Sequence, residues 1–202
     1  MPRRKPNTSG KTAPQQRNGS QLRIIGGQWR GRKLSFPELP GLRPTPDRVR
    51  ETLFNWLAPI VPGSHCLDLF AGSGALGLEA LSRGAASATF VDSAPAVVRQ
   101  IRDNLSLLNG NGVALQASAL QWLQQGGNER FDLVFLDPPF RQGLIDEVIS
   151  PLLPLLADEA WIYLETGRDE VLPALPEDWS LHRDKQAGQV SYRLYHRRLL
   201  RP

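Results

Sequence analysis

Cysteine and histidine, the side chains that most often cross-link a chain or bind a metal, are scarce in this 202-residue sequence. The single cysteine, Cys66, cannot build a disulfide framework, which is typical of a protein of the reducing cytoplasm. The three histidines are scattered and share no metal-ligand spacing with Cys66, so we expect no metal centre. No apolar run reaches the ~20 residues of a membrane-spanning helix or resembles a secretory signal, so we expect no membrane partner.

Acidic residues are nearly absent from the first quarter of the chain. Residues 1–50 contain 12 of the 24 Lys and Arg residues but only two acidic residues, Glu38 and Asp47, which gives a formal charge of +10. The remainder carries −6. A basic segment on a mildly acidic body favours a polyanion such as nucleic acid, although a solvated basic tail that only aids solubility would have the same composition.

The basic quarter divides into two parts. Residues 1–20 lack apolar periodicity and are rich in Pro, Asn, Gln, Ser and Gly, so we expect a disordered tail. Residues 21–45 include two β-prone runs around Gly26-Gly27 and predict a small basic β-ribbon extension. An ordinary edge hairpin with a packed Trp is the alternative. The residues that we expect to contact RNA, through one ring and several cations, are Trp29, Arg30, Arg32, Lys33 and Arg43.

The segment RPTPDRVRETLFNWL predicts a helix that Thr45 caps and Pro46 starts. Val49, Leu53 and Trp56 are spaced to share one buried face. Arg48 and Arg50 are expected to project elsewhere.

Residues 46–202 alternate short apolar runs with helical segments, which predicts one doubly wound α/β domain with a mostly parallel sheet. The expected strands are 66–70, 88–92, 113–116, 131–137 and 160–166, and the expected helices are 75–83, 95–108, 119–125 and 142–156. Two further runs around Ala187-Gly188 predict a terminal antiparallel strand pair.

A glycine-rich turn follows the first strand of this domain. Gly72, Gly74 and Gly77 satisfy G-x-G-x-x-G, and Asp92 ends the next strand, which is the pattern of a dinucleotide site and of an NAD(P)-dependent oxidoreductase. Asp68, just before the turn, argues against a pyrophosphate, because it would repel one. A ligand with a cationic amino group fits better.

Residues 135–140, FLDPPF, end a buried strand with a carboxylate, two prolines and a ring. This segment could be a strand stop in which Asp137 bonds nearby backbone. It could also be a rigid acceptor for an amino group, with Phe140 as a stacking surface. The neighbouring glycine turn favours the second interpretation.

These motifs resemble the class I methyltransferases that use S-adenosylmethionine to modify exocyclic amines. With RIIGGQWRGRKL and RPTPDRVRETLFNWL added, residues 22–198 resemble more narrowly the bacterial 16S rRNA guanine-N2 methyltransferases. The resemblance implies a Rossmann-like fold, S-adenosylmethionine as cofactor, 16S rRNA or the small ribosomal subunit as partner, a monomer, and a cytoplasmic location.

The resemblance also assigns roles to residues. Asp68 would face the methionine amino group, Asp92 would take the ribose hydroxyls, and Gly72 and Gly74 would let the backbone approach the cofactor. The other residues expected at the cofactor are Phe70, Ser73, Ser118 and Ala119, of which Ser118 stands where many relatives carry Asp or Asn. The expected catalytic residues are Asp137, Pro138 and Phe140.

Three other functions remain open from the sequence. An amine methyltransferase could act on adenine N6 in nucleic acid or on a protein glutamine, since D-P-P-F is shared with both. An NAD(P)-dependent oxidoreductase would use the same glycines. A non-catalytic RNA-binding assembly factor would have no need of Asp137.

Overall fold

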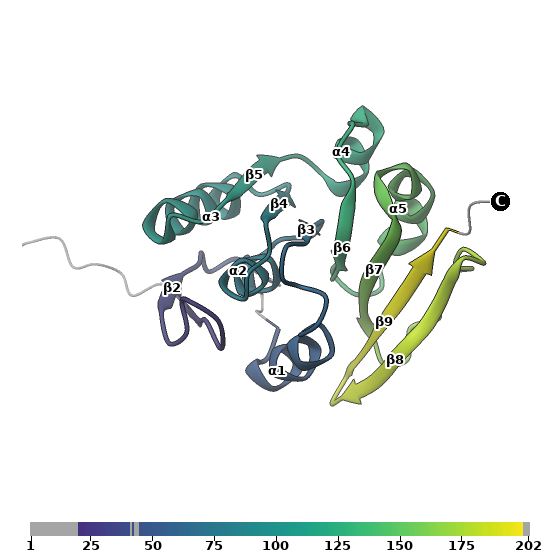
Figure 1. The fold of residues 1–202 in the computed structure, drawn as a ribbon, viewed down its shortest axis with the longest axis horizontal. Coiled ribbons are helices and arrows are strands. Elements are labelled where there is room, and N and C mark those ends of the chain that lie inside the picture. The colour runs from purple at the N-terminus through teal and green to yellow at the C-terminus, as the bar shows by residue number, and fades with distance from the viewer. Residues whose placement is uncertain (1–19, 41, 43–44, 200–202) are drawn as a thin grey trace, which may run out of the picture.

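A computed structural model describes residues 20–40, 42 and 45–199, which form a central sheet and a small ribbon (Figure 1). The sheet has seven strands in the order β5-β4-β3-β6-β7-β9-β8. Strands β3 to β7 pair in parallel, and β9 is antiparallel to both β7 and β8. The predicted Rossmann-like sheet and its terminal antiparallel pair are therefore confirmed.

The elements follow one another as the alternating sequence pattern predicts, with the ribbon first. In chain order they are β1 Gln21–Arg23, β2 Lys33–Ser35, α1 Asp47–Trp56, β3 His65–Asp68, α2 Ala75–Ser82, β4 Ser87–Asp92, α3 Pro95–Leu108, β5 Gly112–Gln116, α4 Ala119–Gln125, β6 Phe131–Leu136, α5 Leu144–Leu152, the 3-10 turn Leu153–Leu155, β7 Leu156–Gly167, β8 Trp179–Ala187 and β9 Val190–Arg198.

The largest boundary difference from the sequence prediction lies at the end of α5. The helix stops at Leu152, a 3-10 turn follows, and β7 begins at Leu156, four residues earlier than expected. Pro154 lacks the N–H group that a continuing helix needs, so the last turn tightens and the chain enters the sheet sooner. Within the described ranges, no helix has both the length and the apolar character required to cross a bilayer.

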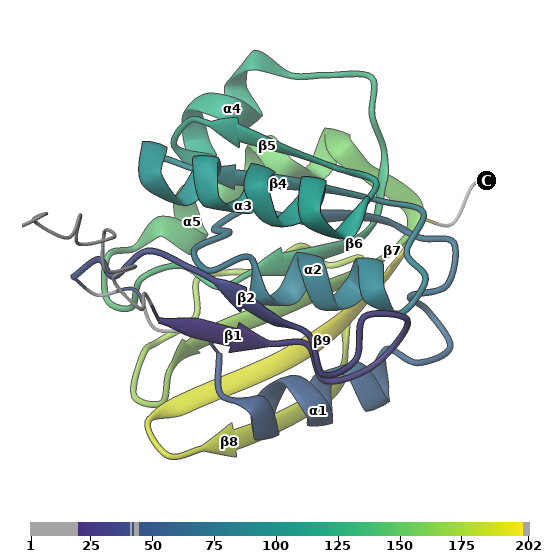
Figure 2. The same ribbon diagram turned by 90° about the vertical axis from the view of Figure 1, so that its left-hand side faces the viewer.

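Helices cover both faces of the sheet, with α1, α2 and α3 on one side and α4 and α5 on the other (Figure 1). One hydrophobic core lies on each face. Side chains alternate between the two cores along the central strands: in β6, Leu133 and Phe135 face α1 and α2, whereas Val134 and Leu136 face the other layer. Figure 2 looks onto the first layer, where the β1–β2 ribbon lies outermost, over α2.

The start of α1 differs from the prediction. Pro46 occupies the N-cap position, and no side chain caps the helix there, so Thr45 is not the cap. Thr45 is nevertheless 6% exposed, which means that its hydroxyl is directed into the protein. Its partner lies far away in the sequence and belongs to the candidate active site.

The buried face of α1 is also shifted by one position from the predicted one. Val49 and Leu53 are buried as expected, and Phe54 is fully buried beside Phe135 of β6. Trp56 is only half-buried and instead stacks on Tyr192 of β9, with ring centroids 5.4 Å apart. α1 therefore closes the core and also covers the antiparallel end of the sheet.

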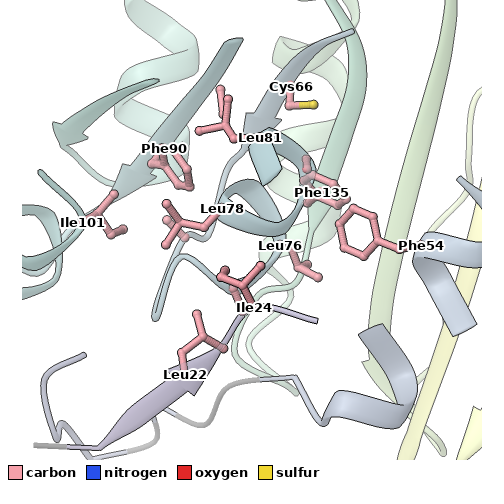
Figure 3. Close-up of a cluster of buried hydrophobic side chains, with 14 of the residues drawn as sticks. Leu22, Ile24, Phe54, Cys66, Leu76, Leu78, Leu81, Phe90, Ile101 and Phe135 are labelled. Atoms are coloured by element: carbon pink, nitrogen blue, oxygen red, sulfur yellow. The ribbon is translucent and has the colours of Figure 1, made fainter. Parts of the chain in front are cut away.

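The ribbon is an integral part of the first hydrophobic core. Leu22, Ile24 and Leu34 are at most 2% exposed. Figure 3 shows Leu22 and Ile24 near Leu76 and Leu78 of α2. The prediction that the Trp29 ring is free to stack on a base is wrong, because its side chain is 8% exposed and belongs to this core. The alternative of a hairpin with a packed Trp describes it correctly.

A buried carboxylate fastens the ribbon to the domain. Glu79 of α2 is 0% exposed and accepts hydrogen bonds from the N–H groups of Ile25 (2.9 Å) and Gly26 (2.7 Å) and from Arg83 Nε (2.7 Å). The guanidinium of Arg50, 1% exposed, lies 3.6 Å from Glu79. Arg50 was expected to project from the fold. Its burial is tolerated because the guanidinium lies beside the Glu79 carboxylate and donates hydrogen bonds to Asp47 and to the Arg23 carbonyl of the ribbon.

Glu79→Gln should destabilise the fold by ~3–5 kcal/mol, the usual cost of leaving a buried charge without its partner. The amide keeps the size of the side chain but cannot neutralise Arg50 and Arg83 or accept all three N–H donors. Urea unfolding followed by circular dichroism measures the change. Glu51→Gln, an exposed change on α1, is the matched control and should have little effect. Equal stabilities of the two variants would contradict the anchoring role of Glu79.

Candidate active site

The candidate site lies at the carboxyl ends of β3, β4, β6 and β7. The chain runs from β3 through β4 to β5 on one side and then crosses to β6 on the other, so the strand order reverses at β3. Such a reversal opens a crevice between the loops that leave the two neighbouring strands. The glycine turn and D-P-P-F leave β3 and β6, so the topology brings together the two motifs that the sequence singled out.

The glycine turn requires glycine at two positions. Gly72 has φ +51°, and a Cβ there would lie 2.9 Å from the Leu42 side chain. Gly74 has φ +75° and starts α2. Gly77 has another role, because a Cβ at this position would lie 2.3 Å from the Phe90 ring, so α2 can approach β4 closely. Within the same turn, Ser73 is buried and Phe70 is half-buried.

Asp68 ends β3 underneath the glycine turn. Its side chain is 2% exposed, and Oδ2 accepts a hydrogen bond from the Gly77 N–H at 3.0 Å. Burial raises the pKa of Asp68 well above its usual value, the bond from Gly77 opposes the rise, and the charges of Asp137 and Asp92 add to it. A cationic group placed beside Asp68 would stabilise the ionised form.

Asp92, at the end of β4, ties two loops together. Its Oδ2 accepts from the Gly72 N–H at 2.9 Å and its Oδ1 from the Ala94 N–H at 2.8 Å. The carboxylate thereby fixes the glycine turn against the exit of β4. Each oxygen has a further lone pair, so Asp92 can still accept bonds from ligand hydroxyls.

Ser118 starts α4 through a capping box. Its hydroxyl accepts from the Gln121 N–H at 3.2 Å, and the Gln121 side chain accepts from the Ser118 N–H at 3.4 Å. The hydroxyl proton of Ser118 and its second lone pair are left for a ligand. Ala119 follows as the first residue of the helix and is 8% exposed.

Asp137 leaves β6 at the edge of the crevice and is half-buried. The hydroxyl of Thr45 donates to its Oδ2 at 3.2 Å. Burial raises the pKa of Asp137 to about 6, and the bond from Thr45 limits that rise. Pro138 is buried behind it, whereas Phe140 is 38% exposed. A Cβ on Gly167 would lie 3.8 Å from the Phe140 ring, so the ring rests against the end of β7 and presents its other side outward.

The sequence interpretation missed two residues of β7 that adjoin Asp137. Tyr163 donates its hydroxyl to Glu165 Oε2 at 2.6 Å, and both side chains are buried. Burial, and after it the charge of Asp137, raises the pKa of Glu165 to about 8, although the bond from Tyr163 lowers it. A carboxylate inside the apolar run WIYLET was the available sequence signal.

A cleft of about 320 Å³ adjoins D-P-P-F between the loops that follow β6 and β7. Glu170 bridges the two loops by accepting from the N–H groups of Arg141 (3.0 Å) and Gly167 (3.1 Å). Arg141 adopts a φ of +61°, which the bridge helps to hold. Pro138 and Pro139 form one wall of this cleft, and Thr166, Val171 and Leu172 are on the other.

Three of the four predicted RNA-contacting cations lie on the ribbon and not in this crevice. Arg30, Arg32 and Lys33 are exposed on the ribbon, and Arg43 lies outside the described residues. In the ranges that the structure covers, no group of three or more His, Cys, Asp or Glu side chains is arranged to hold a metal ion.

Three comparisons relate this geometry to known proteins. The family model Conserved hypothetical protein 95 matches residues 22–196. The ribosomal RNA small subunit methyltransferase D of Escherichia coli (strain K12) is 55% identical over 197 residues, covering 96% of this chain and 95% of the relative. The protein of the same name in Haemophilus influenzae is 49% identical over 181 residues, covering 87% and 93%.

Solved structures agree with this similarity. A structure from Escherichia coli, described as a methyltransferase, superposes with a TM-score of 0.82 at 55% identity and covers 90% of this chain and 100% of its own. A more distant structure, described as a methyltransferase in complex with SAH, has a TM-score of 0.68 at 15% identity and covers 93% of this chain and 57% of its own, so it shares the fold.

The raised pKa of Glu165 predicts how the free energy of unfolding changes with pH. The folded protein retains a proton on Glu165 up to about pH 8, whereas an unfolded chain releases it near 4.5, so wild-type stability falls as pH rises between these values. Glu165→Gln keeps a neutral acceptor for Tyr163 and removes the ionisation. The variant should match wild type near pH 5 and be more stable at pH 9, by ~1–3 kcal/mol.

Denaturant unfolding at pH 5, 7 and 9 measures the difference. Glu177→Gln, in an exposed loop, is the control and should follow the wild-type pH dependence. A Glu165→Gln curve parallel to wild type across this range would show that Glu165 ionises freely in the folded state.

Proposed function

The chain belongs to the family of the ribosomal RNA small subunit methyltransferases D, and we propose that it transfers a methyl group from S-adenosylmethionine to N2 of a guanine in 16S rRNA. The observation that carries the proposal is Asp137 at the exit of β6. Its Oδ2 receives the Thr45 hydroxyl, and its Oδ1 has no hydrogen-bond partner among the residues that the structure describes. One oxygen is therefore free to accept a bond from a substrate amine.

The charge of the crevice supports the cofactor. Asp68, Asp137 and Glu165 have no ion-pair partner in the described part of the chain, and burial raises the pKa of all three. A pyrophosphate, as in NAD(P), would be repelled by the ionised forms of these carboxyl groups and would raise their pKa values further. The methionine ammonium of S-adenosylmethionine would be attracted, most directly by Asp68.

The glycine turn and Asp92 complete the cofactor site. Positive φ at Gly72 and Gly74 turns the backbone tightly at the crevice, and the absence of Cβ atoms avoids contacts with the side chains of Leu42 and Leu78. Asp92 retains lone pairs for the ribose hydroxyls. When bound, S-adenosylmethionine supplies an electrophilic methyl carbon on its sulfonium.

The remaining chemistry belongs to residues around D-P-P-F. The lone pair of a guanine N2 nitrogen is delocalised into the ring, which makes the amine a poor nucleophile. Bonds from its two N–H groups to Asp137 Oδ1 and to the Pro138 carbonyl favour a pyramidal nitrogen with its lone pair free. Consecutive prolines fix φ and hence hold that carbonyl in place. In-line positioning of amine and methyl carbon contributes ~7–11 kcal/mol in well-oriented reactions.

The exposed ring of Phe140 and the adjoining cleft fit a nucleotide that has left its stack. Phe140 can stack on the target base, and the apolar walls of the cleft can receive part of a neighbouring nucleotide. The same acceptors would also suit an adenine N6 or a glutamine amide. Guanine N2 is preferred because the R-G-R and R-P-T-P-D-R-V-R segments make the resemblance to the rRNA enzymes more specific than D-P-P-F alone does.

Two substitutions test the proposal on small ribosomal subunits that lack the modification. One is expected to lower turnover and the other to weaken cofactor binding. Asp137→Asn should reduce turnover at least ~100-fold because the amine loses a charged acceptor, while S-adenosylhomocysteine binding changes little. Asp68→Asn is the matched change on the neighbouring strand and should weaken S-adenosylhomocysteine binding by ~1.5–3 kcal/mol. Turnover and calorimetric titration are the two measurements.

Mass spectrometry of the digested rRNA identifies the product nucleoside in the same reactions. N2-methylguanosine is the expected product, and N6-methyladenosine would select the alternative substrate. Near-normal turnover by Asp137→Asn would exclude the acceptor role, and normal cofactor binding by Asp68→Asn would show that the glycine turn is misassigned.

The basic ribbon makes a separate prediction about RNA binding. Each phosphate contact contributes roughly 0.7–0.9 to the slope of log affinity against log salt, so converting Arg30, Arg32 and Lys33 to Gln should flatten the slope by about two units. Binding of 16S rRNA at several salt concentrations measures this slope. All three side chains are exposed, so the ribbon should stay folded and cofactor affinity should not change.

The charge-matched control converts Arg168, Arg183 and Lys185, which are exposed near the other edge of the sheet. Its slope should remain that of wild type. If the control flattens the slope and the ribbon variant does not, the RNA surface lies at β8 instead.

A further inference from the structure

Thr45 has the sequence context of a helix cap, but its hydroxyl makes a tertiary contact and does not cap α1. It stands between Pro44 and Pro46, immediately before α1. A Thr at this point would ordinarily accept a bond from an N–H of the first helical turn. No such bond forms, and the hydroxyl instead donates to Asp137 Oδ2, 92 residues further along the chain.

The position of Thr45 is fixed by its surroundings. A residue that precedes proline is confined to extended conformations, so Pro46 limits the backbone of Thr45. The first turn of α1 is held in turn by Arg50, which donates to Asp47 Oδ1 at 2.6 Å and to the Arg23 carbonyl at 3.0 Å. At 6% exposed, the Thr45 side chain has little room for another rotamer. The hydroxyl is therefore a prearranged donor.

The charge of Asp137 raises the pKa of the three ionisable groups that face it. Asp68 faces it from β3, and Tyr163 and Glu165 face it from β7, each coupled to it electrostatically. Within the described ranges, Thr45 supplies the one hydrogen bond that Asp137 receives. A donor to a carboxylate favours the anion, so Thr45 counteracts the effect of burial.

We propose that Thr45 is a positioning residue for Asp137: its hydroxyl holds Oδ2, which leaves Oδ1 directed at the substrate amine, and it stabilises the anionic form. The inference rests on the proposed function, because it assigns to Asp137 the role of amine acceptor. It gives the R-P-T-P-D segment a part in the reaction, through a contact with the residue that touches the substrate.

The test compares Thr45→Val, which removes the hydroxyl at constant shape, with Thr45→Ser, which keeps it. Losing the donor raises the pKa of Asp137, which is about 6 in the free wild-type protein, so the acid limb of kcat/KM should move upward by about one pH unit. At pH 6 the ionised fraction of Asp137 then falls from about one half to about one tenth, so kcat/KM should fall at least about fivefold. Thr45→Ser should restore the wild-type profile.

Total transfer of labelled methyl into small subunits is the readout, with S-adenosylhomocysteine binding and thermal unfolding as checks on folding. Thr52→Val is the matched control, because Thr52 also lies in α1 but donates its hydroxyl to the Arg48 carbonyl at 3.0 Å. It should leave the pH profile unchanged. A purely structural role of Thr45 would lower unfolding temperature or cofactor affinity without moving the acid limb.

Two outcomes would overturn the inference: a Thr45→Val profile that superimposes on wild type, or a Thr45→Ser variant as impaired as Thr45→Val. Either result leaves the proposed function intact if wild type still forms N2-methylguanosine. Conversely, a different methylated nucleoside would contradict the guanine assignment, while the pH shift would still report on Thr45 and Asp137.

Discussion

The gathering of carboxylates at one edge of a parallel sheet is the constraint on which the rest of this structure depends. Asp68, Asp137 and Glu165 come from adjacent strands whose carboxyl ends coincide, and burial raises the pKa of each. Such a cluster is costly unless it meets a cation or N–H donors. S-adenosylmethionine and a substrate amine would bring both, so the burial of these carboxyl groups also selects what can bind in the crevice.

A second buried carboxylate connects the basic surface to this crevice. Glu79 holds the ribbon through two backbone N–H groups and faces Arg50, which in turn orders the start of α1. Thr45, just before α1, reaches Asp137. These contacts fix the position of the ribbon relative to the crevice, and phosphate contacts made by its exposed cations would orient an RNA as well as attract it.

The local conformations around the candidate site that the sequence predicts have local physical causes. The positive φ of Gly72 and Gly74 calls for glycine, and D-P-P-F ends a strand because proline cannot extend the ladder. The residues that sequence reasoning misplaced or missed have distant partners. Trp29 is covered by the core under the ribbon, and Glu165 acquires its raised pKa from burial and from Asp137 on a neighbouring strand.

The sequence by itself determined the alternation of strands and helices, the glycine turn, the strand end at D-P-P-F and the excess of positive charge, because each depends on neighbouring residues and their periodicity. Tertiary structure alone decided that Arg50 is buried, that the ribbon belongs to the core, and that the Thr45 hydroxyl serves Asp137 and not α1. A hydroxyl before a helix has a local use that satisfies every rule of capping. The packing of α1 against β6 brings the Asp137 carboxylate within reach of this hydroxyl. A contact between residues 92 positions apart cannot be predicted from the local sequence pattern.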